Sequence, residues 1–127
     1  MGKVVLDASA LLALVNEEPG ADTVLAAVPD SVMSAVNLAE VIAKLTDYGL
    51  VEDETRDVLV AFALDIAPFD EALAFLAGHL YGPTRRLGLS LGDRACLALA
   101  RKMGLPALTA DRTWAKLDLG VDVQVIR

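Results

Sequence analysis

The sequence predicts one α/β domain built around a mainly parallel β-sheet. Its 127 residues are enough for a single domain, taken here as residues 1–127, and 55% of them are hydrophobic, so a core can form. Short apolar runs alternate with segments of helical periodicity along the whole chain, and no repeat, low-complexity tract or linker interrupts them. This alternation is typical of helices that connect parallel strands.

Five short segments are predicted as strands. The first contains a continuous apolar run, as expected for a central strand that is buried on both faces. In parallel sheets, sites form outside the carboxyl ends of the strands, so the residues that follow these segments are candidates for function. The predicted strands are Lys3–Leu6, Ser31–Met33, Asp65–Ala67, Ala107–Thr109 and Asp122–Ile126.

Six segments are predicted as helices, and several of their ends carry capping residues. Asp70 is suited to cap the helix that starts at Glu71, and Gly49 and Gly104 are suited to end the helices before them. A short turn is expected to begin near Arg112. The predicted helices are Ser9–Val15, Ala21–Val28, Ala35–Tyr48, Glu52–Leu64, Glu71–Tyr81 and Leu91–Lys102.

Four acidic residues stand where the strands would open into a crevice. Asp7 and Asp111 fall at the ends of predicted strands, and Glu40 and Asp93 fall in the first two turns of predicted helices. Taken alone, each has an ordinary explanation: Asp7 and Asp111 can cap helices, Asp93 completes an S-x-x-D capping box, and Glu40 precedes Lys44 by four residues on a polar face. Taken together, the four favour a common site.

Carboxylates gathered in one place repel each other unless a cation holds them. Mg²⁺ and Mn²⁺ prefer oxygen ligands and keep open positions for water and phosphate oxygens. A bound ion of this kind activates a water and offsets charge that builds on phosphorus. The acids therefore predict a divalent-metal site for phosphodiester hydrolysis. Ser9, Asn37 and Thr109 are candidates to hydrogen-bond the carboxylates or a bound water, although Ser9 and Asn37 also suit the first turns of helices.

Other chemistries fit the sequence poorly. The single histidine, His79, excludes a nuclease that uses two histidines, and Cys/His zinc spacing and phosphate-binding glycine motifs are absent from the sequence. The single Cys96 lies in an apolar run and is interpreted as a core residue. No apolar run reaches the length of a membrane span, and the start reaches an acid too early for a signal peptide, so we expect a cytoplasmic protein.

The net charge of −7 is distributed unevenly. Residues 1–84 contain 14 acidic and 3 basic residues, whereas residues 85–127 contain 4 acidic and 8 basic residues. A phosphate backbone could therefore lie against the C-terminal third, although the same bases are also consistent with solvated helix faces. Arg85 and Arg86, in the predicted loop GPTRRLG, and Arg112, beside Asp111, are candidate phosphate contacts.

The chain resembles the PIN-domain ribonucleases, and more narrowly the VapC toxins of VapBC toxin–antitoxin pairs. The resemblance lies in VVLDASALLALVNEEPG, SAVNLAEVIAKL and LSLGDRACLALARKMGLPALTADRTWAKL, and covers essentially the whole chain. It implies a three-layer α/β/α sandwich around a five-stranded, mainly parallel sheet. It also implies an Mg²⁺- or Mn²⁺-dependent endoribonuclease in which Asp7, Glu40, Asp93 and Asp111 are the catalytic acids and metal ligands, with Ser9 and Thr109 in support.

The same resemblance implies a homodimer, an RNA substrate that is cut by a metal-activated water, and a cognate antitoxin that packs on the toxin. The mean hydropathy of +0.50 is high for a chain of this size and is consistent with covered apolar surface. The alternatives are a non-catalytic PIN-like module that binds RNA or protein, a receiver domain and a haloacid-dehalogenase-type phosphotransferase. The last two lack expected residues: Asp7 has no acidic partner beside it, and Ser9 stands where D-x-D needs a second acid.

Overall fold

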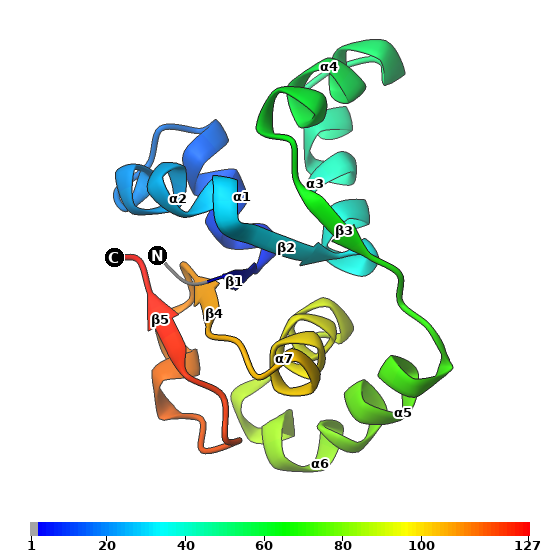
Figure 1. Cartoon of the computed structure of the whole chain (residues 1–127), viewed down its shortest axis with the longest axis vertical. Coiled ribbons are helices and arrows are strands. Elements are labelled where there is room, and N and C mark those ends of the chain that lie inside the picture. Colours follow the sequence, from blue (N-terminus) through cyan, green and yellow to red (C-terminus); the bar gives the residue numbers. More distant parts are fainter. Residues whose placement is uncertain (1–2) are drawn as a thin grey trace.

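The computed structural model describes residues 3–127, and in this part of the chain all five strands form one parallel sheet. The strand order is β3-β2-β1-β4-β5, which makes β1 the central strand (Figure 1). Each strand agrees with its predicted segment to within one residue at either end. The strands are β1 (Val4–Leu6), β2 (Ser31–Ser34), β3 (Asp65–Ala67), β4 (Ala107–Thr109) and β5 (Val123–Val125).

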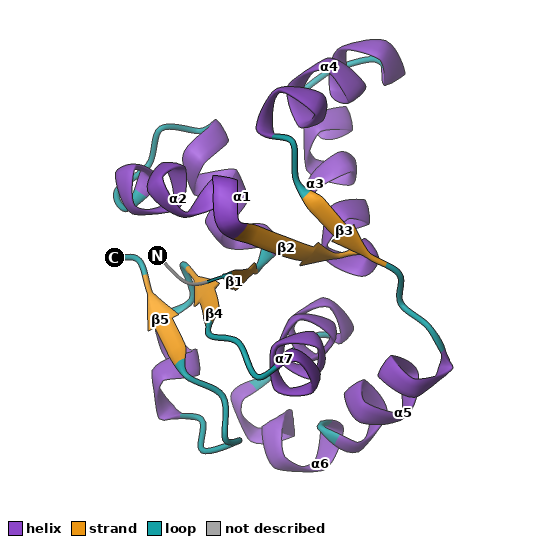
Figure 2. Ribbon diagram, in the orientation of Figure 1, coloured by secondary structure: helices purple, strands orange, loops and turns teal. Residues whose placement is uncertain are grey.

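Helices cover both faces of the sheet and complete the expected three-layer sandwich (Figure 2). Three short 3₁₀ helices join them: η1 (Val28–Asp30), η2 (Arg85–Leu87) and η3 (Arg112–Lys116). The α-helices are α1 (Ala8–Val15), α2 (Ala21–Ala27), α3 (Ala35–Asp47), α4 (Glu52–Phe62), α5 (Glu71–His79), α6 (Tyr81–Thr84) and α7 (Leu91–Met103). No helix within residues 3–127 is long and apolar enough to cross a membrane.

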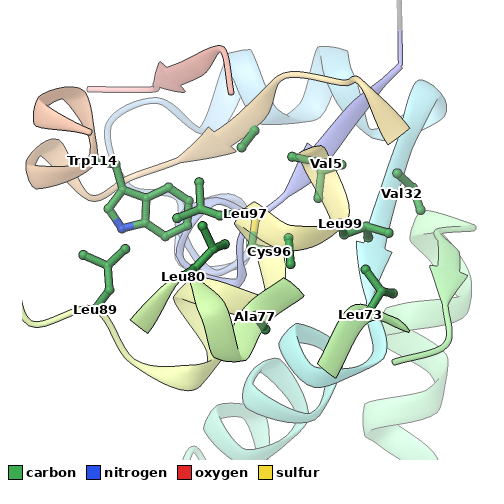
Figure 3. Packing of buried hydrophobic residues seen from close by; sticks show 13 residues of the cluster. Val5, Val32, Leu73, Ala77, Leu80, Leu89, Cys96, Leu97, Leu99 and Trp114 are labelled. Atoms are coloured by element: carbon green, nitrogen blue, oxygen red, sulfur yellow. The ribbon is translucent and has the colours of Figure 1, made fainter. Parts of the chain in front are cut away.

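The alternation of side chains along the strands divides the core into two clusters. Val5 of β1 and Val32 of β2 pack against the helices α5 and α7, with Trp114 buried in the same cluster (Figure 3). Their neighbours Leu6 and Met33 point to the opposite face and pack against α1, α2 and α3. Because β1 is buried on both faces, its residues Val4–Leu6 can be uniformly apolar, as the sequence indicated.

The predicted caps form as expected. The Asp70 side chain accepts a hydrogen bond of 3.0 Å from the Leu73 amide at the start of α5. Gly49, with a φ of +95°, directly follows the C-cap of α3, and Gly104, with a φ of +64°, is the C-cap of α7. Glycine tolerates this left-handed conformation at little cost, so these two positions stop the helices.

The segment GPTRRLG was predicted as a loop, and this prediction is wrong. The chain forms α6 and then η2 here, so Arg85 and Arg86 lie in a 3₁₀ helix. Proline is tolerated in the first turn of a helix, where its missing N–H needs no partner. The buried Thr84 also helps, because its hydroxyl donates a 2.6 Å hydrogen bond to the carbonyl of Leu80. The predicted helix Glu71–Tyr81 is accordingly divided between α5 and α6.

Candidate metal centre at the end of the central strands

The candidate site begins at the carboxyl ends of β1 and β4. These two strands are neighbours in the sheet, and the chain leaves β1 toward β2 on its other side. Such a reversal of strand order opens a crevice at the sheet edge, where parallel α/β proteins bind ligands. Asp7 follows β1 directly and Thr109 ends β4, so sequence positions about a hundred residues apart meet at this point.

Asp7 is buried at this crevice, with 3% of its surface exposed. It occupies the N-cap position of α1, yet its side chain makes no capping hydrogen bond. Its Oδ2 atom instead accepts hydrogen bonds from the hydroxyls of Ser9, at 2.6 Å, and Thr109, at 2.9 Å. The carboxylate is therefore turned away from the helix end and held toward β4.

The two hydroxyls also tie Asp7 to the loop after β4. Ser9 Oγ accepts a hydrogen bond from the Ala110 amide at 3.0 Å, and Thr109 Oγ1 accepts one from the Asp111 amide at 3.1 Å. Since each hydroxyl donates to Asp7 and accepts from the backbone, its orientation is fixed. Ser9 and Thr109 thus hold the Asp7 carboxylate in one direction.

The charged form of Asp7 is disfavoured in this setting. Burial raises the pKa of Asp7 to about 6, although the hydrogen bonds from Ser9 and Thr109 act in the opposite direction. The negative charges of Asp93 and Glu40 raise it further. Burial also raises the pKa of Glu40, again with a contribution from Asp93, and the hydrogen bond from Asn37 opposes it. The three carboxylates therefore act on one another electrostatically, as groups around a shared cation site would.

Glu40 and Asp93 approach the crevice from two helices, α3 and α7. Glu40 accepts a 2.9 Å hydrogen bond from Asn37 one turn earlier in α3. Asp93 forms the capping box that the sequence predicted: its Oδ2 accepts from the Ser90 amide at 2.9 Å, and its own amide donates to Ser90 Oγ at 3.2 Å. The structure contains no ion pair between Glu40 and Lys44 within residues 3–127, so the favourable pair suggested by their spacing does not form.

The three acids line one open pocket of about 590 Å³. In the described chain, one oxygen of each carboxylate takes part in the hydrogen bonds above, and the second oxygen makes none. No three acidic, histidine or cysteine side chains among residues 3–127 are already gathered as ligands of one ion. The residues lining the pocket are Asp7, Ala8, Ser9, Leu12, Glu40, Ala43, Lys44, Asp47 and Asp93.

The donor set fits a hard divalent cation. All the free donors are carboxylate oxygens, which Mg²⁺ and Mn²⁺ prefer, and they come from three different elements around one hollow. A buried carboxylate with a raised pKa carries an electrostatic cost that a cation would remove. The free oxygens of Asp7, Glu40 and Asp93 are therefore the candidate ligands for such an ion.

Asp111 differs from these three acids in what its side chain contacts. It is the N-cap of η3, and its Oδ1 accepts hydrogen bonds from the amide and hydroxyl of Thr113, at 2.9 and 2.7 Å. It does not line the pocket, and it reaches Asp7 only through its backbone amide and Thr109. The ordinary capping role that the sequence allowed for Asp111 is thus present.

None of the three predicted phosphate contacts lines the pocket. Arg85 and Arg86 are exposed on η2, and the guanidinium of Arg112 donates a 3.0 Å hydrogen bond to the carbonyl of Arg127. The basic residue that does line it is Lys44, which sequence reasoning treated only as a partner of Glu40. Its position one turn after Glu40 was the signal that could have identified it.

A larger hollow, of about 1160 Å³, lies between α3 and α4 and is mainly apolar. Figure 1 shows these two helices projecting together from the rest of the molecule. Val51 and Val60, which line this groove, are 63% and 75% exposed. An exposed apolar groove of this kind is a candidate binding surface for another molecule.

Comparison with known proteins agrees with this architecture. The PIN domain family matches residues 4–119. A toxin–antitoxin complex from Klebsiella pneumoniae contains a chain that is 20% identical, with a TM-score of 0.75 and 98% of each chain covered. The DNA-bound VapBC of Salmonella typhimurium is 19% identical, with a TM-score of 0.73 and both chains fully covered.

A third similar structure is VapC20 of Mycobacterium tuberculosis, described as a sarcin–ricin loop-cleaving toxin. It is 20% identical, with a TM-score of 0.69, and the match covers 89% of this chain and 93% of that one. At these identities the likeness concerns the fold. A search of curated proteins gave no significant match.

Proposed function

This chain belongs to the PIN domain family, and from that premise we propose that it is a divalent-metal-dependent endoribonuclease. The observation that carries the proposal is the buried Asp7, which is turned away from its own helix end and shares a pocket with Glu40 and Asp93. A capping carboxylate would bond the backbone at the start of α1, and a carboxylate kept for charge pairing would contact a basic side chain. Asp7 does neither, which favours a role in binding a cation.

Asp7, Glu40 and Asp93 would hold Mg²⁺ or Mn²⁺, and Asp111, which lies outside their pocket, would support the site from the loop after β4. When bound, the ion supplies Lewis acidity, which lowers the pKa of a coordinated water and offsets the charge that builds on the phosphate. Ser9 and Thr109 keep the Asp7 carboxylate in place throughout. Because no step needs the RNA 2′-hydroxyl, the expected products carry 5′-phosphate and 3′-hydroxyl ends.

RNA phosphates need positive charge beside this acidic pocket. Lys44 is the one basic residue among those lining it, and we assign it a contact to a phosphate next to the cut. Arg85, Arg86 and Arg112 lie outside the pocket and would contact the RNA backbone at a distance from the cut. Such contacts add affinity that falls with salt, and they carry no sequence specificity by themselves.

We also propose that the chain is the toxin of a toxin–antitoxin pair and that it acts as a homodimer. The structurally similar proteins include a toxin–antitoxin complex from Klebsiella pneumoniae and the DNA-bound VapBC of Salmonella typhimurium. The apolar groove between α3 and α4 supports a protein partner. The two charged residues that line the groove, Glu52 and Arg56, form an ion pair with each other at 2.9 Å, so the partner segment should present a mainly apolar face.

The test is RNA cleavage by purified, partner-free protein with Mg²⁺ or Mn²⁺, alongside EDTA and Asp7→Asn controls. We expect metal-dependent cuts with 5′-phosphate ends that vanish with EDTA and in Asp7→Asn. Folded protein that binds Mn²⁺ but cuts nothing in total cellular RNA would instead support a non-catalytic PIN-like binding module. Size measurement of the same sample would test the homodimer, and co-expression with an adjacent small open reading frame would test the antitoxin.

A further inference from the structure

We propose that Asn37 and Gly92 form a positioning unit that fixes the distance between the Glu40 carboxylate and the first turn of α7. The inference rests on the proposed function, because it concerns how two ligand-bearing helices are held around a cation. Neither residue would touch the cation or the RNA. Both act through the acids beside them, Glu40 on α3 and Asp93 on α7.

Asn37 joins the two helices with a single nitrogen atom. Its side chain is 0% exposed, and its Nδ2 donates one hydrogen bond to Glu40 Oε1 and another to the backbone carbonyl of Gly92, each of 2.9 Å. An amide nitrogen carries two hydrogens in a fixed plane, so both are used and their directions are set. Since Gly92 precedes Asp93, the second bond holds the turn that carries this acid.

Burying the Asn37 amide in this position costs free energy, because one of its two polar atoms stays unpaired. Its Oδ1 is buried and has no hydrogen-bond partner in the described chain. Leucine has a similarly branched side chain and would avoid an unpaired buried carbonyl, but it is larger than asparagine and would lose both hydrogen bonds. We therefore attribute the asparagine at this position to the two hydrogen bonds that its nitrogen donates, one to Glu40 and one to the Gly92 carbonyl of α7.

Gly92 completes the unit by leaving space. A Cβ atom at this position would overlap the carboxylate of Glu40. The backbone of Gly92 is helical, so a positive φ does not account for the glycine, and glycine is otherwise unfavourable within a helix. The absence of a side chain is therefore what allows Glu40 to lie against the first turn of α7.

The test compares Mn²⁺ binding, thermal unfolding and RNA cleavage for Asn37→Leu and Gly92→Ala. Mn²⁺ alone is the probe, and electron paramagnetic resonance measures the free ion. The matched controls are Asn16→Leu, at the other asparagine of the chain, whose amide bonds Tyr48, and Gly78→Ala, where a Cβ meets nothing within 4 Å. Neither control residue lines the pocket with the acids.

We expect Asn37→Leu and Gly92→Ala each to bind Mn²⁺ about 10- to 100-fold more weakly, as is typical when support for metal ligands is lost. The melting temperature of Asn37→Leu should change little, because removal of the unpaired carbonyl offsets part of the loss of two hydrogen bonds. In cleavage, kcat should fall more than KM rises, since RNA contacts are unchanged. The double variant should bind Mn²⁺ only slightly more weakly than the single variant with the lower Mn²⁺ affinity, because both substitutions displace the same carboxylate.

Three outcomes would overturn the inference. Variants that bind Mn²⁺ as tightly as the wild type, while the wild type cuts RNA, would leave the nuclease standing and remove the positioning role. Loss of Mn²⁺ affinity that merely follows a lower melting temperature in both variants would indicate a general packing role. A wild-type protein that neither binds Mn²⁺ nor cuts RNA would overturn the proposed function, and the inference with it. If Asn37→Leu does not fold, the Mn²⁺ affinity of Gly92→Ala tests the inference alone. This variant should fold, because the flexible Glu40 side chain can move away from the new methyl group.

Discussion

The ends of β1 and β4 carry acids in similar positions but in opposite surroundings. Asp7 and Asp111 are both N-cap residues of the helix that follows their strand. Asp111 is partly exposed and caps η3 through Thr113, whereas Asp7 is buried and leaves the start of α1 without a side-chain cap. The hydrogen bonds of the side chain, and not its position at a strand end, therefore distinguish a capping acid from a candidate ligand. An acid that stays buried and does not cap its helix is held for another purpose.

The largest effect should come from Asp7→Asn. Asparagine can still accept the hydrogen bonds from Ser9 and Thr109 but cannot supply a charged ligand, so cleavage should fall on the order of 1000-fold, as when one member of a catalytic set is removed. The metal-free variant should nevertheless be more stable at pH 7, by up to about 3 kcal/mol, because the buried charge is gone. Urea unfolding in EDTA and single-turnover cleavage measure the two effects. Wild-type cleavage by this variant would refute the assigned role of Asp7.

The next-largest effect should be the pH dependence of stability that Asp7 causes. The pKa of Asp7 is raised from 3.8 to about 6 in the folded protein, so the folded state holds this proton more tightly than the unfolded state. The resulting stabilisation is fully present below about pH 4 and is lost as the pH rises through 6. Without metal, the wild type should therefore lose up to about 3 kcal/mol relative to Asp7→Asn between pH 4 and pH 7.5. A constant difference between the two proteins would contradict this expectation.

Asp111 should respond differently to the same kind of substitution. Asparagine caps helices about as well as aspartate, so Asp111→Asn should change stability by only a few tenths of a kcal/mol, whereas Asp111→Ala should cost about 1 kcal/mol. Because Asp111 lies outside the pocket, cleavage should fall only about tenfold in Asp111→Asn. Thermal unfolding and cleavage rates test both values. A 1000-fold loss of cleavage with a gain in stability would make Asp111 equivalent to Asp7.

The smallest effect should come from the basic residue at the pocket. Lys44→Gln should raise KM for RNA by at most about fivefold, since exposed charge contacts are weak, and it should also reduce the salt dependence of binding. Arg85→Gln should change KM less, because Arg85 does not line the pocket. Titration of RNA at several salt concentrations compares the two variants. If Arg85→Gln raised KM as much as Lys44→Gln or more, we would infer that the RNA runs closer to η2 than to Lys44.

Sequence periodicity was sufficient for the sheet and most helices, because strands and amphipathic helices follow local patterns. It was not sufficient for α6 and η2, where Gly82 and Pro83 indicate a turn while contacts of the buried Thr84 favour a helix. The candidate site, too, could be predicted from the sequence only in part. The sequence identified the acids, but the bond from Asn37 to Gly92 spans 55 positions and depends on how α3 packs against α7. No local pattern reports such a contact.

The bond between Asp7 and Thr109 spans 102 positions, and this has a consequence for synthesis in the cell. At about 5–20 residues per second, some 5–20 seconds separate the translation of these two residues. The central strand β1 is synthesised about as long before β4, the neighbour with which it pairs in the sheet. A nascent chain that stops before β4 therefore has Asp7 and Ser9 but lacks Thr109, the second hydroxyl that holds the Asp7 carboxylate. On the proposed function, prematurely terminated products should not cleave RNA.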